Sequence, residues 1–187
     1  MGMIEIRWHG RGGQGVVTGS NLLARAAIYE GKYAQHFPEF GPERSGAPVR
    51  SYTRISDEPI DIHSGIYSPD IVIVIDPAMT KDVAELAEGI KEGGDVLVNY
   101  GKEEKWIIDW AKEKKVKLHA VDARKISIEE INREIYNVPM LAALVKVKGV
   151  VDISTVEKVL ADRFSGEILE ANLKIMKRAY EEVKTLV

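Results

Sequence analysis

Short apolar segments alternate with amphipathic segments along the first two thirds of the chain. The apolar segments have the length and the β-branched content of strands, and they are residues 3–8, 71–76, 95–99 and 116–122. The segment IVIVID at 71–76 lacks polar alternation, which is typical of a central parallel strand with both faces covered. Apolar residues at helical spacing follow at 79–90 and around 106–110. This alternation of strands and helices predicts an α/β fold.

A further helix and a β-hairpin are predicted in the first third of the chain. Residues 16–30 are small and apolar and predict a helix that ends at Gly31, followed by a strand at 32–37. The next strand, at 49–56, alternates Val49, Ser51, Thr53 and Ile55 with Arg50, Tyr52 and Arg54. After a turn, IDIH at 60–63 repeats the alternation. We therefore expect a hairpin with one half-exposed face.

The last third of the chain is predicted to be helical. Two pairs fit the spacing of a capping box, Ser127 with Glu130 and Ser154 with Glu157. Asn137 precedes a Val-Pro helix start. A final helix has one apolar stripe, made of Leu169, Leu173, Met176, Tyr180 and Val183. The fold expected for residues 1–187 is a single-domain, three-layer α/β/α sandwich with a mostly parallel (mixed) sheet, a β-hairpin insertion and a helical C-terminal tail.

Several polar and aromatic residues have a structural interpretation. Asp76, Asn99 and Asp122 are the last residues of predicted strands, where they either line a crevice at the carboxyl ends of the sheet or cap helices and make turns. Trp106 and Trp110 lie one helical turn apart, and we expect both in the core. Asn172, on the final helix, is expected to face solvent or another subunit.

Composition narrows the functional classes. The net charge of −3 and the pI near 5.9 provide no overall field that would attract nucleic acid or an anionic membrane. Because the chain has neither a run of about 18 apolar residues nor a secretory leader, we expect it to be cytoplasmic. The charged fraction of 29% and the absence of cysteine also hint at a thermophile.

The absence of cysteine also limits the chemistry of the chain. Without thiols it cannot form disulfides or hold an iron–sulfur cluster through cysteine. Its four histidines do not have the spacing of metal ligands, and no G-x-S-x-G motif marks a nucleophilic serine. We therefore expect neither a metal site nor a catalytic residue in this chain.

A glycine-rich loop is the clearest candidate site. Gly10, Gly12 and Gly15 match G-x-G-x-x-G between a strand and a helix, a context in which backbone amides can receive a phosphate. A dinucleotide site also needs an acid at the end of the second strand, but that strand is predicted to end at Phe37, and Glu39 lies beyond Pro38. The glycines alone fit a tight turn as well as they fit a nucleotide site.

Four long segments resemble one known family. They are GRGGQGVVTGSNLLARAA, EGKYAQHFPEFGPERSGAPVRSYTRIS, PDIVIVIDPA and NVPMLAALVKVKG, and they span the chain from its first strand to Gly149. In these segments the chain resembles the gamma subunit of pyruvate (2-oxoacid):ferredoxin oxidoreductases. The resemblance implies an enzyme complex that converts pyruvate, coenzyme A and oxidised ferredoxin to acetyl-CoA, carbon dioxide and reduced ferredoxin.

The family also implies cofactors and partners that this chain does not supply alone. Related complexes use thiamine diphosphate, Mg²⁺ and [4Fe–4S] clusters, and the resemblance implies alpha, beta and delta subunits as partners and ferredoxin as electron acceptor. The thiamine signature pairs GDG with an asparagine some 25 to 30 residues later, whereas Asn99 lies only four residues after Asp95 here. We therefore expect the isolated chain to be inactive.

The resemblance suggests what the candidate residues could do. Arg44, Arg50 and Arg54 form a local basic group, and guanidinium groups suit the phosphates of coenzyme A. The predicted site, for coenzyme A or for a subunit interface, comprises Gly10, Gly12, Gly13, Gln14, Gly15, Arg44 and Arg50. Alternatively, Arg50 and Arg54 occupy a solvent-exposed strand face or form salt bridges with a neighbouring subunit. Two other functions stay open: an NAD(P)-binding reductase and a scaffold whose glycines only permit close packing.

Overall fold

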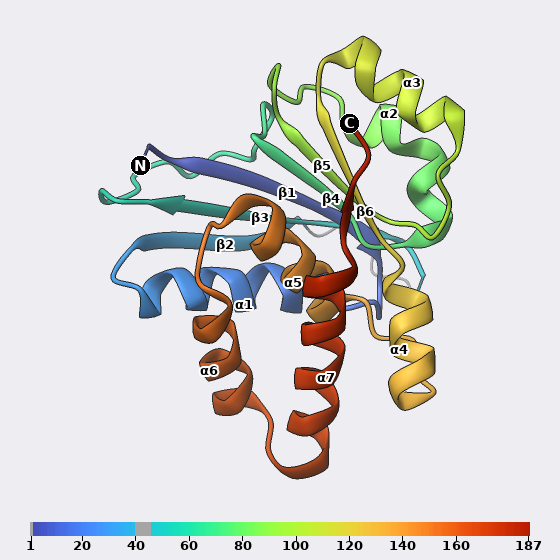
Figure 1. Cartoon of the computed structure of the whole chain (residues 1–187). Helices are drawn as coiled ribbons and strands as arrows, with labels where there is room; N and C mark the ends of the chain where they lie inside the picture. The colour runs from blue at the N-terminus through green and yellow to red at the C-terminus, as the bar shows by residue number, and fades with distance from the viewer. Residues whose placement is uncertain (1, 40–45) are drawn as a thin grey trace.

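The computed structural model of the chain describes residues 2–39 and 46–187. Its strands form one seven-stranded sheet in the order β2-β3-β1-β4-β5-β6-β7 (Figure 1). The strands are β1 (Ile4–Arg11), β2 (Tyr33–Glu39), β3 (Pro48–Ser56), β4 (Ile71–Val74), β5 (Asp95–Asn99), β6 (Lys117–Val121) and β7 (Lys184–Thr185). The strands β1, β4, β5 and β6 are mutually parallel, whereas β3 and β7 run antiparallel to their neighbours. The predicted mixed α/β sheet is therefore confirmed.

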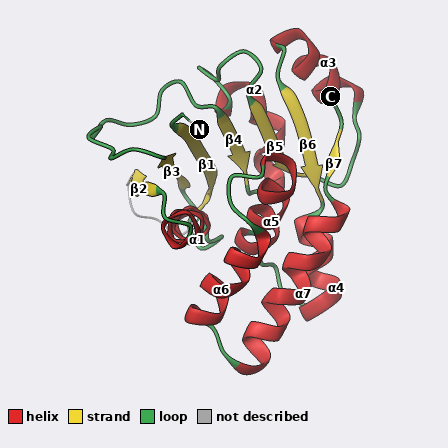
Figure 2. Ribbon diagram, turned by 60° about the vertical axis from the view of Figure 1, so that its left-hand side comes forward, coloured by secondary structure: helices red, strands yellow, loops and turns green. Residues whose placement is uncertain are grey.

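Helices cover both faces of the sheet (Figure 1 and Figure 2). The helices are α1 (Val16–Tyr29), the 3₁₀ helix η1 (Pro77–Asp82), α2 (Val83–Leu86), α3 (Lys105–Lys114), α4 (Ala123–Ile131), α5 (Asn137–Lys148), α6 (Ile153–Arg163) and α7 (Gly166–Glu182). One apolar core lies between the sheet and α1, α5, α6 and α7, and a second lies under α2 and α3. In β4, Ile71 and Ile73 face the first core while Val72 and Val74 face the second. This arrangement confirms the three layers and the doubly covered central strand. No helix in the described residues is long and apolar enough to cross a bilayer.

The antiparallel hairpin has a different partner from the one predicted. β3 pairs with β2 and β1, and residues 60–63 belong to no strand. Side chains bind this segment in place of a backbone ladder: Gln35 donates to the carbonyl of Ile60 at 3.3 Å, and Arg54 Nη2 donates to that of Ser64 at 2.8 Å. The predicted pairing of 49–56 with 60–63 was therefore wrong, because period-two alternation does not specify a partner strand.

One predicted helix end was correct, whereas both predicted capping boxes were wrong. Gly31, with φ +77°, follows α1 as expected, and its amide donates to Ile28 O at 2.9 Å. Both capping boxes were wrong, because Ser127 lies inside α4 and Ser154 inside α6. α4 is instead capped by Asp122, whose carboxylate accepts from the amide of Lys125 at 3.0 Å. The hydroxyl of Ser127 donates to the carbonyl of Ile135.

The predicted positions of the two tryptophans, of Asn172 and of the apolar residues at 79–90 were only partly correct. Trp110 packs against the second core as expected, but Trp106 is 42% exposed, so its assignment to the core was wrong. Asn172 is 5% exposed and donates to the carbonyl of Ile168 at 2.8 Å, so within this chain it does not face solvent. Residues 79–90 place their apolar side chains in the second core, yet they form η1 and α2 in place of one helix.

Two arginines are buried on the face of β1 and β3 opposite α1. Arg54 is 1% exposed; it pairs with Glu5 at 2.9 Å and donates to the carbonyls of Ser64 and Gly65. Arg7 is 7% exposed and donates to the carbonyls of Ile66, Leu86 and Glu88. The prediction that Arg54 lies on a half-exposed face was therefore wrong. The two guanidinium groups hold the segment after β3 and the end of α2 over this face.

Removal of the Arg54 guanidinium should destabilise the fold strongly. We expect Arg54→Ala to lower the free energy of unfolding by about 3–5 kcal/mol, because the substitution leaves the Glu5 carboxylate and two carbonyls without their donor. Arg50→Ala, on the same strand face but exposed, should cost under about 1 kcal/mol. Urea unfolding of both variants measures the difference, and equal losses would contradict the role assigned to Arg54.

Candidate functional site

The carboxyl ends of β1 and β4 form the topological switch point of the sheet. The chain leaves β1 toward α1 on one face and leaves β4 toward η1 and α2 on the other. Ligands of open α/β sheets bind outside the carboxyl ends of the strands at such a point. The glycine loop at 12–15 and Asp76 lie on its two sides. The switch point is therefore the first place to look for a site.

The glycine loop is closed by its own hydrogen bonds and by the start of β3. The amide of Gly12 donates to Ala47 O at 2.9 Å, and the amide of Arg11 donates to Gln14 Oε1 at 2.7 Å. Gln14, a predicted ligand residue, therefore turns its side-chain oxygen to the loop backbone. These contacts fix the loop against the strand that carries Arg50.

Close packing explains two of the glycines. A Cβ atom at Gly10 would lie 2.5 Å from Val16 Cγ2, so a larger residue would displace α1 from β1. Gly15 has φ +80°, and a Cβ there would lie 2.8 Å from Asn137 Nδ2 at the start of α5. The start of α1 therefore packs directly against the start of α5. A tight turn and a ligand site both remain compatible with this geometry.

The dinucleotide interpretation has a specific difficulty. β2 extends to Glu39, so an acid does end the second strand, contrary to the sequence prediction. However, β3 lies between β1 and β2, which separates Glu39 from the glycine loop by one strand. The Glu39 carboxylate also accepts a hydrogen bond from the Tyr52 hydroxyl. Glu39 is therefore not arranged as the ribose-binding acid of a dinucleotide fold.

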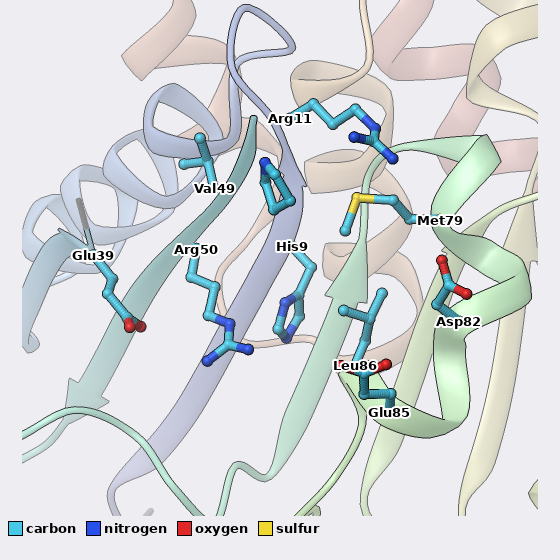
Figure 3. A pocket seen from close by; sticks show the side chains of 10 residues that line it. His9, Arg11, Glu39, Val49, Arg50, Met79, Asp82, Glu85 and Leu86 are labelled. Atoms are coloured by element: carbon cyan, nitrogen blue, oxygen red, sulfur yellow. The ribbon is translucent and has the colours of Figure 1, made fainter. Parts of the chain in front are cut away.

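A cleft of about 480 Å³ opens beside the switch point, and we call it the β1–β3 cleft (Figure 3). Its lining comes from β1, β2, β3, η1 and α2, and consists of His9, Arg11, Glu39, Pro48, Val49, Arg50, Met79, Asp82, Glu85 and Leu86. Arg50 is exposed, and Figure 3 shows its side chain beside that of His9. The acids Asp82 and Glu85 lie on the opposite wall. The strand side of the cleft therefore carries two arginines and the acid Glu39, whereas the helix side carries two acids.

A smaller hollow of about 350 Å³ adjoins the glycine loop, and we call it the glycine-loop hollow. Gly12, Gly13 and Gly15 line it, together with Arg11 and Val49, which also line the β1–β3 cleft. The predicted glycines and Arg50 thus lie around two adjoining concave surfaces. Gly10 lies in β1, and the predicted Arg44 falls outside the described residues.

Sequence reasoning missed Arg11, which lies between the two concave surfaces. Its Nε donates to Asp76 Oδ2 at 2.8 Å, and its Nη1 donates to Gly46 O at 3.1 Å. The other oxygen of Asp76, Oδ1, accepts from the amide of Ala78 and caps η1, as one of the two interpretations of Asp76 expected. The position of Arg11 inside the glycine motif was the available signal.

Asn99 and Asp122 lie farther along the same edge of the sheet. Asn99 Nδ2 donates to Ile75 O at 2.8 Å and so ties the end of β5 to the end of β4, while Asp122 caps α4. Both line a separate cleft of about 620 Å³, together with Tyr100 and Ile128. The polar residues of this edge therefore do not converge on one crevice.

His9 and Tyr52 have shifted pKa values in this region. Burial, reinforced by the nearby Arg7 and Arg50, lowers the pKa of His9 to about 3, and Arg7 Nε donates to His9 Nε2 at 3.1 Å. Burial and the hydrogen bond to Glu39 raise the pKa of Tyr52 to about 12. His9 and Tyr52 are both neutral at pH 7, so the positive charge of the β1–β3 cleft comes from its arginines. Across residues 2–39 and 46–187, no group of three His, Asp or Glu side chains could hold a metal ion.

Comparison with known proteins relates nearly the whole chain to one family. Residues 5–182 match the model of the pyruvate ferredoxin/flavodoxin oxidoreductase family. The pyruvate/ketoisovalerate oxidoreductases common subunit gamma of Thermococcus litoralis is 49% identical over 185 residues, covering 99% of this chain and 98% of that protein. Pyruvate synthase subunit PorC of Thermotoga maritima is 44% identical, covering 96% of this chain and 94% of its own length. The crystal structure of the pyruvate oxidoreductase subunit PORC from the same organism superposes with a TM-score of 0.85 at 41% identity, covering 99% of both chains.

The buried His9 should make the fold sensitive to acid. In the unfolded chain His9 binds a proton below its ordinary pKa of 6.5, whereas in the folded chain it does so only near pH 3. The contribution of His9 to the free energy of unfolding is therefore fully present above pH 6.5 and falls by about 1.4 kcal/mol per pH unit below it. We expect His9→Gln, which keeps an acceptor for Arg7, to remove this slope in unfolding experiments between pH 6.5 and 4. His63→Gln, at an exposed histidine, is the control, and parallel curves for His9→Gln and the unmodified chain would contradict the assignment.

Proposed function

Because the chain belongs to the pyruvate ferredoxin/flavodoxin oxidoreductase family, we propose that it is the gamma subunit of a multi-subunit pyruvate:ferredoxin oxidoreductase. The assembled enzyme would convert pyruvate, coenzyme A and oxidised ferredoxin to acetyl-CoA, carbon dioxide and reduced ferredoxin. The names of the relatives support this proposal, since they are subunits of pyruvate synthase and of pyruvate/ketoisovalerate oxidoreductases. The family match and the full-length identities make it stronger than a likeness in fold alone.

The redox chemistry belongs to partner subunits under this proposal. The chain has no cysteine, so it does not fit a [4Fe–4S] cluster held by thiolates. Its one GGD segment forms the start of β5, where the Asp95 carboxylate binds His119 and Lys148 and is not free to orient Mg²⁺ on thiamine diphosphate. We assign those cofactors to alpha, beta and delta subunits in the cytoplasm, with ferredoxin as the electron acceptor of the whole complex.

The contribution of this chain is proposed to be the approach path of coenzyme A. Arg50 carries the proposal, because it is an exposed cation in a concave surface next to the glycine loop and the switch point. A guanidinium group binds phosphate oxygens through two parallel hydrogen bonds. His9 and Tyr52 beside Arg50 are neutral at pH 7, so neither of them adds charge next to this guanidinium group at that pH.

The shared use of the gamma subunit supports a role on the coenzyme A side of the reaction. The Thermococcus litoralis relative is named as common to pyruvate and ketoisovalerate oxidoreductases. Pyruvate and ketoisovalerate differ in their side chains, whereas the thiol acceptor is the reactant that two such enzymes would share. A subunit that served coenzyme A would fit both enzymes without alteration. Discrimination between 2-oxoacids would then lie in another subunit.

Charge reversal of Arg50 tests this role in the assembled enzyme. We expect Arg50→Glu to raise the KM for coenzyme A about tenfold or more, because a phosphate contact becomes a repulsion, and to leave the KM for pyruvate unchanged. Arg163→Glu, at an exposed arginine of α6 outside the cleft, should behave as the unmodified enzyme. The measurement is steady-state reduction of ferredoxin, with co-purification of all subunits as the check on assembly.

The outcomes separate the possible roles of the β1–β3 cleft. If the Arg50→Glu chain lost the other subunits on purification, the cleft would be assigned to a subunit interface and not to coenzyme A binding. An intact complex with an unchanged KM for coenzyme A would remove both roles from Arg50.

A further inference from the structure

We infer that Arg11 binds the diphosphate of coenzyme A and that Asp76 is the residue that positions it. This inference rests on the proposed function, and it concerns a pair that spans the switch point. Arg11 ends β1, and Asp76 is the N-cap residue of η1, two residues after β4. The Arg11 Nε–Asp76 Oδ2 contact of 2.8 Å therefore crosses the point where α/β sheets bind ligands.

Two hydrogen bonds hold the guanidinium group of Arg11 along one edge, and its other N–H donors are available to a ligand. Asp76 Oδ2 accepts a hydrogen bond from Nε, and the carbonyl oxygen of Gly46 accepts one from Nη1 at 3.1 Å. Asp76 is itself fixed, because it is 4% exposed and its second oxygen accepts from Ala78 N at 2.9 Å. A guanidinium has five N–H donors, so the contacts within the described residues leave three of them for a ligand. The group is thus pre-oriented without being saturated.

The Arg11–Asp76 ion pair contributes more to the orientation of the Arg11 side chain than to the stability of the fold. The Arg11 side chain is 39% exposed, and an ion pair with one such partner contributes only about 0–1 kcal/mol. The main effect of the pair is that Arg11 loses little rotational freedom when it binds an anion.

The position of Arg11 suggests which anion it binds. Arg11 and Val49 line both the β1–β3 cleft and the glycine-loop hollow, and this shared boundary, the ridge, would lie under the middle of an elongated ligand that entered both surfaces. Coenzyme A has this shape, with an adenosine portion at one end, a pantetheine arm at the other and a diphosphate between them. A ligand that occupied both surfaces would lay its diphosphate over the ridge. A planar guanidinium fork matches phosphate oxygens there.

The test compares two thiol acceptors in the assembled oxidoreductase. Pantetheine has the reactive thiol of coenzyme A but no phosphate. We expect Arg11→Gln to raise the KM for coenzyme A about tenfold and to leave the kinetics with pantetheine and the KM for pyruvate unchanged. Asp76→Asn keeps the cap on η1 but weakens the hold on Arg11, so a rise of about threefold is expected. Arg11→Lys should restore part of the loss, and Arg163→Gln is the matched control.

Several results would overturn the inference. Equal effects of Arg11→Gln on coenzyme A and pantetheine would mean that Arg11 does not contact the phosphates. Loss of a subunit from the Arg11→Gln and Asp76→Asn complexes would assign the pair to an interface. If Arg11→Gln leaves the KM for coenzyme A unchanged while Arg50→Glu raises it, Arg11 is excluded and the proposed function stands. If neither variant changes that KM, both proposals fail.

Discussion

The burial of Arg7 and Arg54 is the constraint on which the open side of the sheet depends. A charged group removed from water must find partners, and these two guanidinium groups find carbonyls in the segment after β3 and at the end of α2. β1 and β3 therefore have a polar face that is covered by irregular chain, whereas β4 and β5 have an apolar face covered by helices. The β1–β3 cleft lies on this polar face where Arg50 is exposed.

The same constraint decides which charges the cleft presents. Arg7 takes the Nε2 lone pair of His9, so His9 contributes a neutral surface at the base of the cleft. Arg50, two residues beyond the start of β3, is exposed and lines the cleft. Buried arginines thus act as the frame, and the exposed Arg50 is the proposed contact group. Spacing along the strand separates the two roles, although the residue type is the same.

Local pattern predicted the central elements well and the open face poorly. The unbroken apolar run at 71–76 specifies a strand covered on both sides, and the structure has β4 there with all four residues buried. The alternation at 49–56 identifies two faces but not which face meets solvent, since Arg54 is buried only through partners 10 to 49 residues away. The capping box at Ser127 was wrong, whereas the capping interpretation of Asp122 was confirmed, because β6 ends at Val121 and α4 begins at Ala123.

The glycine motif illustrates how far a site can be predicted without its surroundings. Gly10 and Gly15 are required by the packing of α1 against β1 and α5, so their presence alone does not identify a ligand. That packing, however, brings the starts of two helices without side-chain caps to the switch point, and helix N-termini carry partial positive charge. Arg11 and Arg50 add full charges within the same region of a protein whose net charge is −3. Glu39, Asp82 and Glu85 also line the cleft, so an anion would have to bind close to the two arginines. The anion site proposed for this edge therefore depends on its assembled neighbours, and the glycines permit the close packing that brings those neighbours together.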